Sequence, residues 1–171
     1  MMKTLICVAL ESEMPREKLD GEPILYTGVG KINATISLMA RLHDYPEIQR
    51  VINVGSAGGI KGRVKRGEVC QFTLFREDLS FPTHEEEIIE YGEGGLIIST
   101  FDRFQTKEPL WVTDAVDMES YALAKVCKLM GKEFLCYKFI SDLIGDTNQE
   151  KVWEDEHKNG QQLLLDVINK L

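Results

Sequence analysis

Three carboxylates in this chain of 171 residues stand where buried acidic groups could take part in catalysis. Glu13 follows an apolar run, Glu119 stands at the start of a helical pattern, and Asp142 follows a second apolar run. A carboxyl group buried beside a ligand can have a pKa suited to donating or accepting a proton. Each position also has an ordinary explanation: an acidic turn for Glu13, a favourable helix start for Glu119, and a turn or helix N-cap for Ser141 and Asp142.

The helix and the strand that would position two of these carboxylates have clear patterns. Apolar residues recur at helical spacing over residues 118–130. Residues 134–140 form an apolar run interrupted only by Lys138, which is typical of a strand in a covered sheet. Glu119 is therefore expected at the start of a helix, and Ser141 and Asp142 just past the end of a strand. In open α/β sheets, ligands bind beyond the carboxyl ends of the strands.

Two further strand ends carry candidate functional residues. Residues 4–10 read as a buried strand that leads to Glu13, and residues 50–54 as another that leads directly into a loop of small residues at 55–59. Backbone amides in such a loop can approach a ligand closely, although a tight turn that needs glycine has the same composition. Three strand–loop junctions thus supply Glu13, the loop and Asp142 at the same kind of place, which favours a common site.

Strand and helix patterns alternate along the chain, which predicts one α/β domain of three layers over residues 1–171. The remaining strands are expected at 23–28, 69–75 and 96–99, and the remaining helices at 32–42 and 153–171. No internal repeat or linker interrupts this alternation.

The composition narrows the classes of partner. The formal net charge is −8 without any basic run, which argues against binding nucleic acid or an anionic membrane through a general electrostatic patch. The first apolar run meets Glu11 too early for a signal peptide, and no stretch approaches membrane-spanning length, so we expect a cytoplasmic protein. The four cysteines lack CxxC spacing and the three histidines are dispersed, so no metal site is expected. Cys7, Cys127 and Cys136 lie in apolar surroundings, which predicts buried thiols.

Five segments, in chain order, resemble the purine nucleoside phosphorylase/nucleosidase superfamily. They read ALESEM, TGVGKINA, INVGSAGGI, AVDMESYALAKVC and FISD. They are most like the bacterial 5′-methylthioadenosine/S-adenosylhomocysteine nucleosidases, but the chain is shorter than these enzymes between the loop at 55–59 and Glu119. The resemblance implies a three-layer α/β/α fold with a central mixed sheet, catalysis without a metal or organic cofactor, and a homo-oligomer (dimer or larger).

The resemblance also implies roles for individual residues. Asp142 matches the general acid that protonates N7 of the leaving purine, with Ser141 beside it to orient the carboxyl group. Glu119 matches the residue that holds the ribose 2′- and 3′-hydroxyls, and Met118 packs against the sugar. Glu13 matches the base that activates water.

Further positions of the resemblance surround the sugar and the base. Ser56 and the amides of Gly58 and Gly59 match the loop that borders the water or phosphate site. Either Phe101 or Phe104 matches the aromatic residue that stacks on the purine base.

One departure bears on the choice of nucleophile. Related hexameric phosphorylases carry a phosphate-binding arginine where this chain has Asn53, and losing a guanidinium removes a main phosphate anchor. Together with Glu13, this favours hydrolysis of the N-glycosidic bond of a purine nucleoside, although Arg16 or Arg63 could still supply charge. The alternatives are a phosphate-dependent nucleoside phosphorylase and a nucleoside-binding member without turnover. The three matching carboxylates argue against this last alternative, and the shortened middle argues for it.

Overall fold

A computed structural model describes residues 3–19, 21–78 and 88–171. Eight strands form one sheet with the order β2-β1-β3-β7-β6-β4-β5, and β8 pairs with both β3 and β4. The strands are β1 (Lys3–Val8), β2 (Ile24–Tyr26), β3 (Ile48–Gly59), β4 (Val69–Glu77), β5 (Ile88–Glu90), β6 (Leu96–Thr100), β7 (Ala115–Asp117) and β8 (Glu133–Leu143). The sheet is mixed, because β3 runs parallel to β1 and β8 but antiparallel to β7.

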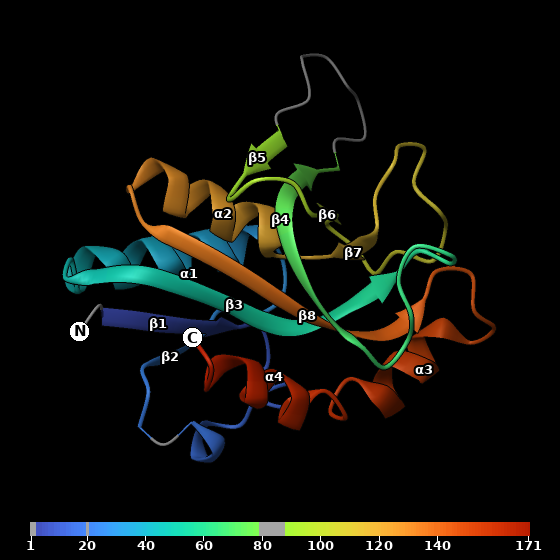
Figure 1. Cartoon of the computed structure of the whole chain (residues 1–171), viewed down its shortest axis with the longest axis horizontal. Helices are drawn as coiled ribbons and strands as arrows, with labels where there is room; N and C mark the ends of the chain where they lie inside the picture. Colours follow the sequence, from blue (N-terminus) through green and yellow to red (C-terminus); the bar gives the residue numbers. More distant parts are fainter. Residues whose placement is uncertain (1–2, 20, 79–87) are drawn as a thin grey trace.

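Two pairs of helices cover the sheet (Figure 1). They are α1 (Lys31–Asp44) with α2 (Ser120–Leu129), and α3 (Gln149–Glu156) with α4 (Gln161–Ile168). A short 3-10 helix, η1 (Arg16–Lys18), lies between β1 and β2.

The alternating side chains of β1 show why helices cover both faces of the sheet. Leu5 and Cys7 belong to the core cluster that includes residues of α1 and α2, whereas Ile6 and Val8 belong to the cluster that includes Leu164 of α4. Successive side chains of a strand point to opposite faces of a sheet, so a strand that is apolar throughout must be buried on both sides. The three-layer α/β/α arrangement with a central mixed sheet is thus confirmed.

The two central strands are longer than the sequence suggests. β3 and β8 pair from Arg50 with Glu133 to Gly59 with Leu143, with a register shift between Ala57 and Gly58. The prediction of a loop at 55–59 was therefore wrong, because these small residues continue β3. The same pairing corrects the expected end of the second strand, since Ser141 and Asp142 lie inside β8.

The carboxyl-terminal region is also divided differently. The single helix expected at 153–171 is two helices, α3 and α4, separated at residues 157–160. Gly160 lies against Phe139 of β8 so closely that a Cβ atom there would stand 2.3 Å from the ring. The chain therefore turns where α4 comes down onto the sheet, and α3 begins four residues earlier than expected.

The cysteine prediction is confirmed, because Cys7, Cys127 and Cys136 are buried free thiols, as is Cys70. Among the described residues, no group of three or more His, Cys, Asp or Glu side chains could hold a metal ion. In the same parts of the chain, no helix combines the length and apolar character needed to cross a membrane.

Candidate active site

A cavity of about 260 Å³ lies at the carboxyl ends of β1, β3 and β8, which are parallel neighbours. Its walls come from the segments after β1, β2 and β6, from the ends of β3 and β8, from the junction of β7 and α2, and from α3. The structure brings seven of the residues proposed from sequence to this cavity: Glu13, Ser56, Gly58, Phe104, Met118, Glu119 and Asp142. Ser141 does not line the cavity but donates hydrogen bonds to two residues that do, Asp142 and Ala57, and Phe101 does not line it.

Asp142 lies near the end of β8 and is 1% exposed. The Ser141 hydroxyl donates a hydrogen bond to Oδ1 at 2.6 Å, and Nε2 of Gln149 donates one to Oδ2 at 2.7 Å. Burial raises the pKa of Asp142, and the two hydrogen bonds oppose that shift. The carboxyl group is thus fixed in orientation and inclined to keep its proton, as a general acid requires.

Glu13 lies in the turn after β1 and is buried. Its Oε1 accepts hydrogen bonds from the Ser56 amide at 2.8 Å and the Ser56 hydroxyl at 2.6 Å, while Oε2 accepts one from the Leu10 amide at 3.2 Å. The indole of Trp153 donates in turn to the Ser56 hydroxyl at 2.9 Å. These bonds fix the Glu13 carboxylate at the cavity wall, where it could accept a proton from water.

Glycines in β3 make room for two of the carboxylates. A Cβ atom at Gly55 would lie 3.2 Å from Oε1 of Glu13, and one at Gly58 would lie 3.1 Å from Oδ2 of Asp142. Both contacts would be tighter than ordinary van der Waals packing. The small residues expected to expose amides therefore also let carboxylate oxygens approach the strand.

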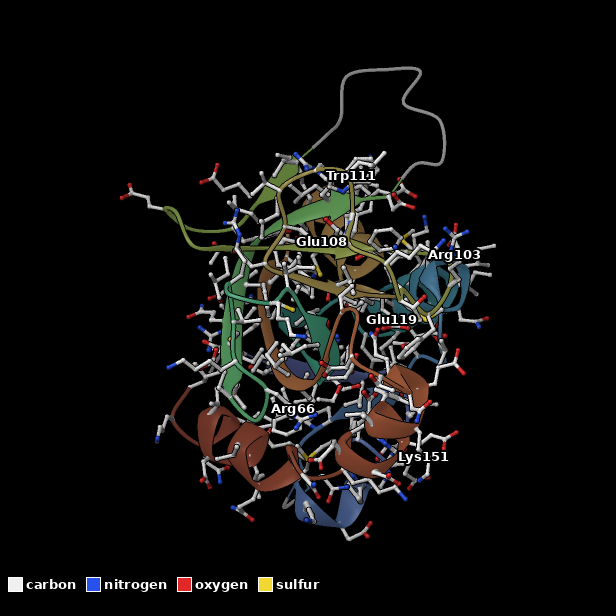
Figure 2. The ribbon with its side chains drawn as sticks, turned by 90° about the vertical axis from the view of Figure 1, so that its right-hand side faces the viewer. Arg66, Arg103, Glu108, Trp111, Glu119 and Lys151 are labelled. Carbon is white, nitrogen blue, oxygen red and sulfur yellow. The ribbon has the colours of Figure 1, made fainter. Side chains whose placement is uncertain are left out.

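Glu119 directly precedes α2 but serves a different helix. Its Oε1 accepts a hydrogen bond at 2.9 Å from the amide of Gly30, the residue just before α1. The amide of Ser120 at the start of α2 is instead capped by Asp117 at 2.9 Å. Burial and the nearby Asp117 carboxylate raise the pKa of Glu119 to about 7. Figure 2 shows Glu119 inside the molecule, and its position by the cavity suits contact with hydroxyl groups of a ligand.

Asp117 and Lys138 form a buried ion pair beside Glu119, and no role was predicted for this pair from the sequence. Nζ of Lys138 lies 3.2 Å from Oδ2 of Asp117, and each side chain is 2% exposed. Thr100 and Ser120 also donate hydrogen bonds to the Asp117 carboxylate. Burial alone would lower the pKa of Lys138, but Asp117 raises it above its ordinary value, and Glu119 and Glu13 act in the same direction. Lys138 is the one polar residue in an otherwise apolar strand pattern, and this was the signal in the sequence for a buried charge.

Residues 101–105, the segment after β6, form what we call the strap, and its residues Arg103, Phe104 and Gln105 line the cavity. Asp102 pairs with Lys31 at the start of α1 at 3.2 Å, and the Gln105 carbonyl accepts a hydrogen bond from Gln149 at 3.0 Å. Between these anchors, Phe104 lines the cavity and makes an edge contact with Trp153, with ring centroids 6.2 Å apart.

Of the two phenylalanines, Phe104 is therefore the one positioned to stack on an aromatic ring of a ligand. Phe101 is buried in a separate cluster with Ile60, Val116 and Ile144. Gln149 and Trp153 of α3 also line the cavity. Neither residue is marked in the sequence, because Gln149 stands in a polar segment and Trp153 in an amphipathic helix.

The residues considered for phosphate binding from the sequence do not line the cavity. Asn53 is buried in the sheet, where it donates to the Cys7 carbonyl at 3.1 Å and accepts from the Ser120 hydroxyl at 3.1 Å. Arg16 stacks over Tyr26, and Arg63 lies 3.4 Å from Asp114. Among the described arginines, Arg103 of the strap alone lines the cavity; Figure 2 shows it near the edge of the molecule.

Comparison with known proteins agrees with this arrangement. A family model described as the phosphorylase superfamily matches residues 98–169, which include the strap, Asp117, Glu119 and Asp142. A 5′-methylthioadenosine/S-adenosylhomocysteine nucleosidase of Thermotoga maritima is 31% identical over 173 residues, covering 86% of this chain and 79% of that protein. One of the same description from Colwellia psychrerythraea is 26% identical, covering 90% of this chain and 82% of that protein. The chain belongs to the purine nucleoside phosphorylase/nucleosidase superfamily. Within it, the chain is similar to the 5′-methylthioadenosine/S-adenosylhomocysteine nucleosidases.

Solved structures share the fold. The Colwellia psychrerythraea nucleosidase in complex with adenine superposes with a TM-score of 0.83 at 23% identity, covering 99% of this chain and 96% of that one. The futalosine hydrolase of Helicobacter pylori gives a TM-score of 0.84 at 16% identity, covering 99% and 97%.

Proposed function

We propose that this chain hydrolyses the N-glycosidic bond of a purine nucleoside of the 5′-methylthioadenosine/S-adenosylhomocysteine type. The observation that carries the proposal is Asp142, a buried and oriented acid that shares one cavity with Glu119 and Glu13. Relatives in the same superfamily bear the name of nucleosidases with this substrate pair. The whole chain acts as one domain, and the reaction needs neither a metal nor an organic cofactor.

Asp142 serves as the general acid. Its proton passes to N7 of the purine, so that the C1′–N9 bond breaks and the base leaves neutral. Ser141 and Gln149 then stabilise the carboxylate that remains, because both donate hydrogen bonds to it. Phe104 stacks on the base and holds it beside Asp142.

Glu119 and Glu13 act on the sugar. Glu119 binds the ribose 2′- and 3′-hydroxyls, Met118 packs against the ring, and the negative charge stabilises the oxocarbenium-like state at C1′. Glu13 takes a proton from a water molecule that attacks C1′. Ser56 holds Glu13 in the required direction, and Gly58 leaves space at the end of β3.

Phosphorolysis is the second candidate within enzymes. It is disfavoured because the carboxylates of Glu13 and Glu119 line the sugar site, where negative charge would repel a phosphate dianion. Arg103 is the cation that would have to offset them, but it lies on the strap and is exposed. A binding protein without turnover is the third candidate, and it gives no account of the fixed acid.

A homo-oligomer is supported by apolar side chains on α1. Ile32, Ile36 and Met39 are 74%, 63% and 42% exposed and recur at helical spacing, so they form one stripe that a second copy could cover. Cytoplasmic location stays a prediction from the sequence.

A product assay tests the proposed function. The protein is incubated with methylthioadenosine, adenosine, inosine and uridine, with and without phosphate, and base and sugar products are resolved. Free purine and free sugar, released independently of phosphate, are the expected result. Sugar 1-phosphate formed only with phosphate would mean a phosphorylase, and tight adenine binding without product would mean a binding protein.

A further inference from the structure

Gln149 makes contacts that the mechanism above uses only in passing. It is the first residue of α3, is 4% exposed, and lines the cavity beside Asp142. Its Nε2 donates one hydrogen bond to Oδ2 of Asp142 at 2.7 Å and another to the carbonyl of Gln105 at 3.0 Å. Both protons of the amide nitrogen are therefore committed, one to the general acid and one to the strap.

The orientation of this amide is fixed from its other side. The Gly145 amide donates a hydrogen bond to Oε1 of Gln149 at 3.2 Å, so the oxygen faces the turn before α3 and the nitrogen faces Asp142. A backbone N–H can only donate and a backbone carbonyl can only accept, so these two neighbours exclude the flipped amide. Gln149 thus presents a donor to Asp142 whenever the Gln105 carbonyl is in place.

A donor at this point affects proton transfer in a defined direction. A hydrogen bond to a carboxylate is stronger than one to the neutral acid, so it stabilises the state of Asp142 after the proton has left. Burial favours the protonated form of Asp142 before the reaction, whereas the hydrogen bond from Gln149 makes it a better proton donor. The two effects are opposed, and an acid that must both hold and release a proton near neutral pH needs both.

We propose that Gln149 is a positioning residue that couples the strap carrying Phe104 to the general acid. When Phe104 lies over the base, the Gln105 carbonyl holds the Gln149 amide against Asp142, so base stacking and acid strength are set together. When the strap is displaced, Gln149 is released from Gln105 and no longer holds the carboxyl group. The inference rests on the proposed role of Asp142.

Other charges near Asp142 must be kept in view in any pH experiment. Asp146, in the turn before α3, favours the protonated form of Asp142, and Arg66, from the segment between β3 and β4, favours the ionised form. Arg66 and Asp146 also lie 3.8 Å from each other, which partly cancels their effects. Across the cavity stand Glu13, Asp117 with its partner Lys138, and Glu119. None of these groups changes when Gln149 is replaced by an apolar side chain.

The test is the pH dependence of hydrolysis by Gln149→Leu. Leucine has nearly the volume of glutamine but offers no donor. A general acid loses activity as pH rises through its pKa, so we expect the alkaline fall in kcat/KM to move up by about one pH unit, given the strength of hydrogen bonds to charged groups. We also expect kcat to fall about tenfold and KM to rise, because Asp142 and Phe104 are both less well held. The matched control is Gln162→Leu on the exposed face of α4, which should leave both the rate and the pH profile unchanged.

A loss of rate with an unmoved alkaline limb would overturn the inference, because it would leave Gln149 with only a structural role. A second readout does not depend on turnover: titration of the Asp142 carboxyl carbon by ¹³C NMR in ligand-free protein. The Asp142 titration should move to higher pH in Gln149→Leu and stay in place in Gln162→Leu; identical titrations in parent and Gln149→Leu would refute the coupling. Absence of hydrolysis by the parent protein would count against the proposed function, while this titration would still decide the coupling.

Discussion

Replacing Lys138 with methionine tests the buried ion pair at the wall of the cavity, where Asp117 is a lining residue. Methionine is similar in length and apolar, so the strand keeps its packing while Asp117 loses its counter-ion. Removing one partner of a buried pair costs about 3–5 kcal/mol, because the remaining charge is left without compensation. Thr100 and Ser120 still donate hydrogen bonds to Asp117, so we expect the lower end, a loss of about 3 kcal/mol in the free energy of unfolding.

The assay is urea unfolding at pH 7 followed by circular dichroism, with free energies from linear extrapolation. Lys158→Met, at an exposed position, is the control and should change stability by about 0.5 kcal/mol or less. The double variant Asp117→Asn with Lys138→Met removes both charges and should recover most of the loss. If Lys138→Met behaved like the control, or if the double variant were no better than the single one, the reasoning about an uncompensated buried charge would be refuted.

The remaining predictions concern the three cavity carboxylates. Asp142→Asn should lower kcat by about 100-fold or more with little change in the unfolding midpoint; unchanged turnover would exclude Asp142 as the general acid. Glu119→Gln should weaken the binding of ribosides and abolish any preference for ribosides over 2′-deoxynucleosides, as measured by competition. The pKa of Glu119 is raised from its ordinary value near 4.5 to about 7, so the folded protein favours the protonated side chain. The stability that this group contributes is full below pH 4.5 and is lost as the pH rises to about 7. Glu119→Gln should therefore make the free energy of unfolding less dependent on pH between 4.5 and 7. Glu13→Gln should slow hydrolysis more than it weakens adenine binding in calorimetry; equal losses would indicate a structural role.

Local sequence patterns predicted most of the fold, because the spacing of apolar residues within a short segment already distinguishes a strand from a helix. The helix over 118–130 and the apolar strand after it both exist, and the alternation along the chain predicted three layers. The error at 55–59 has a physical reason. Glycine and alanine have low strand propensity, so only the pairing of β3 with β8 explains why the strand continues there.

The candidate site was predictable where a motif marked it and not where contacts between distant segments form it. Glu13, Glu119 and Asp142 stand in segments that resemble a known superfamily, and all three line one cavity. Gln149 and Trp153 carry no such mark. Their importance comes from hydrogen bonds to Asp142 and to Ser56, which depend on how α3 packs beside β8. Lys138 was visible as a polar residue in an apolar run, but its partner Asp117 could be found only in the folded chain.

Three carboxyl groups in one cavity can have different roles only if their surroundings differ, and here they do. Glu13 accepts three hydrogen bonds from backbone and serine donors, which suits the acceptor of a proton from water. Glu119 accepts one from Gly30, stands beside Asp117 and has a pKa near neutrality. Asp142 is the most buried of the three, and donors from the chain hold each of its oxygens. The division into base, sugar ligand and acid therefore follows from hydrogen bonding and burial, and exchanging the side chains without their partners would not exchange the roles.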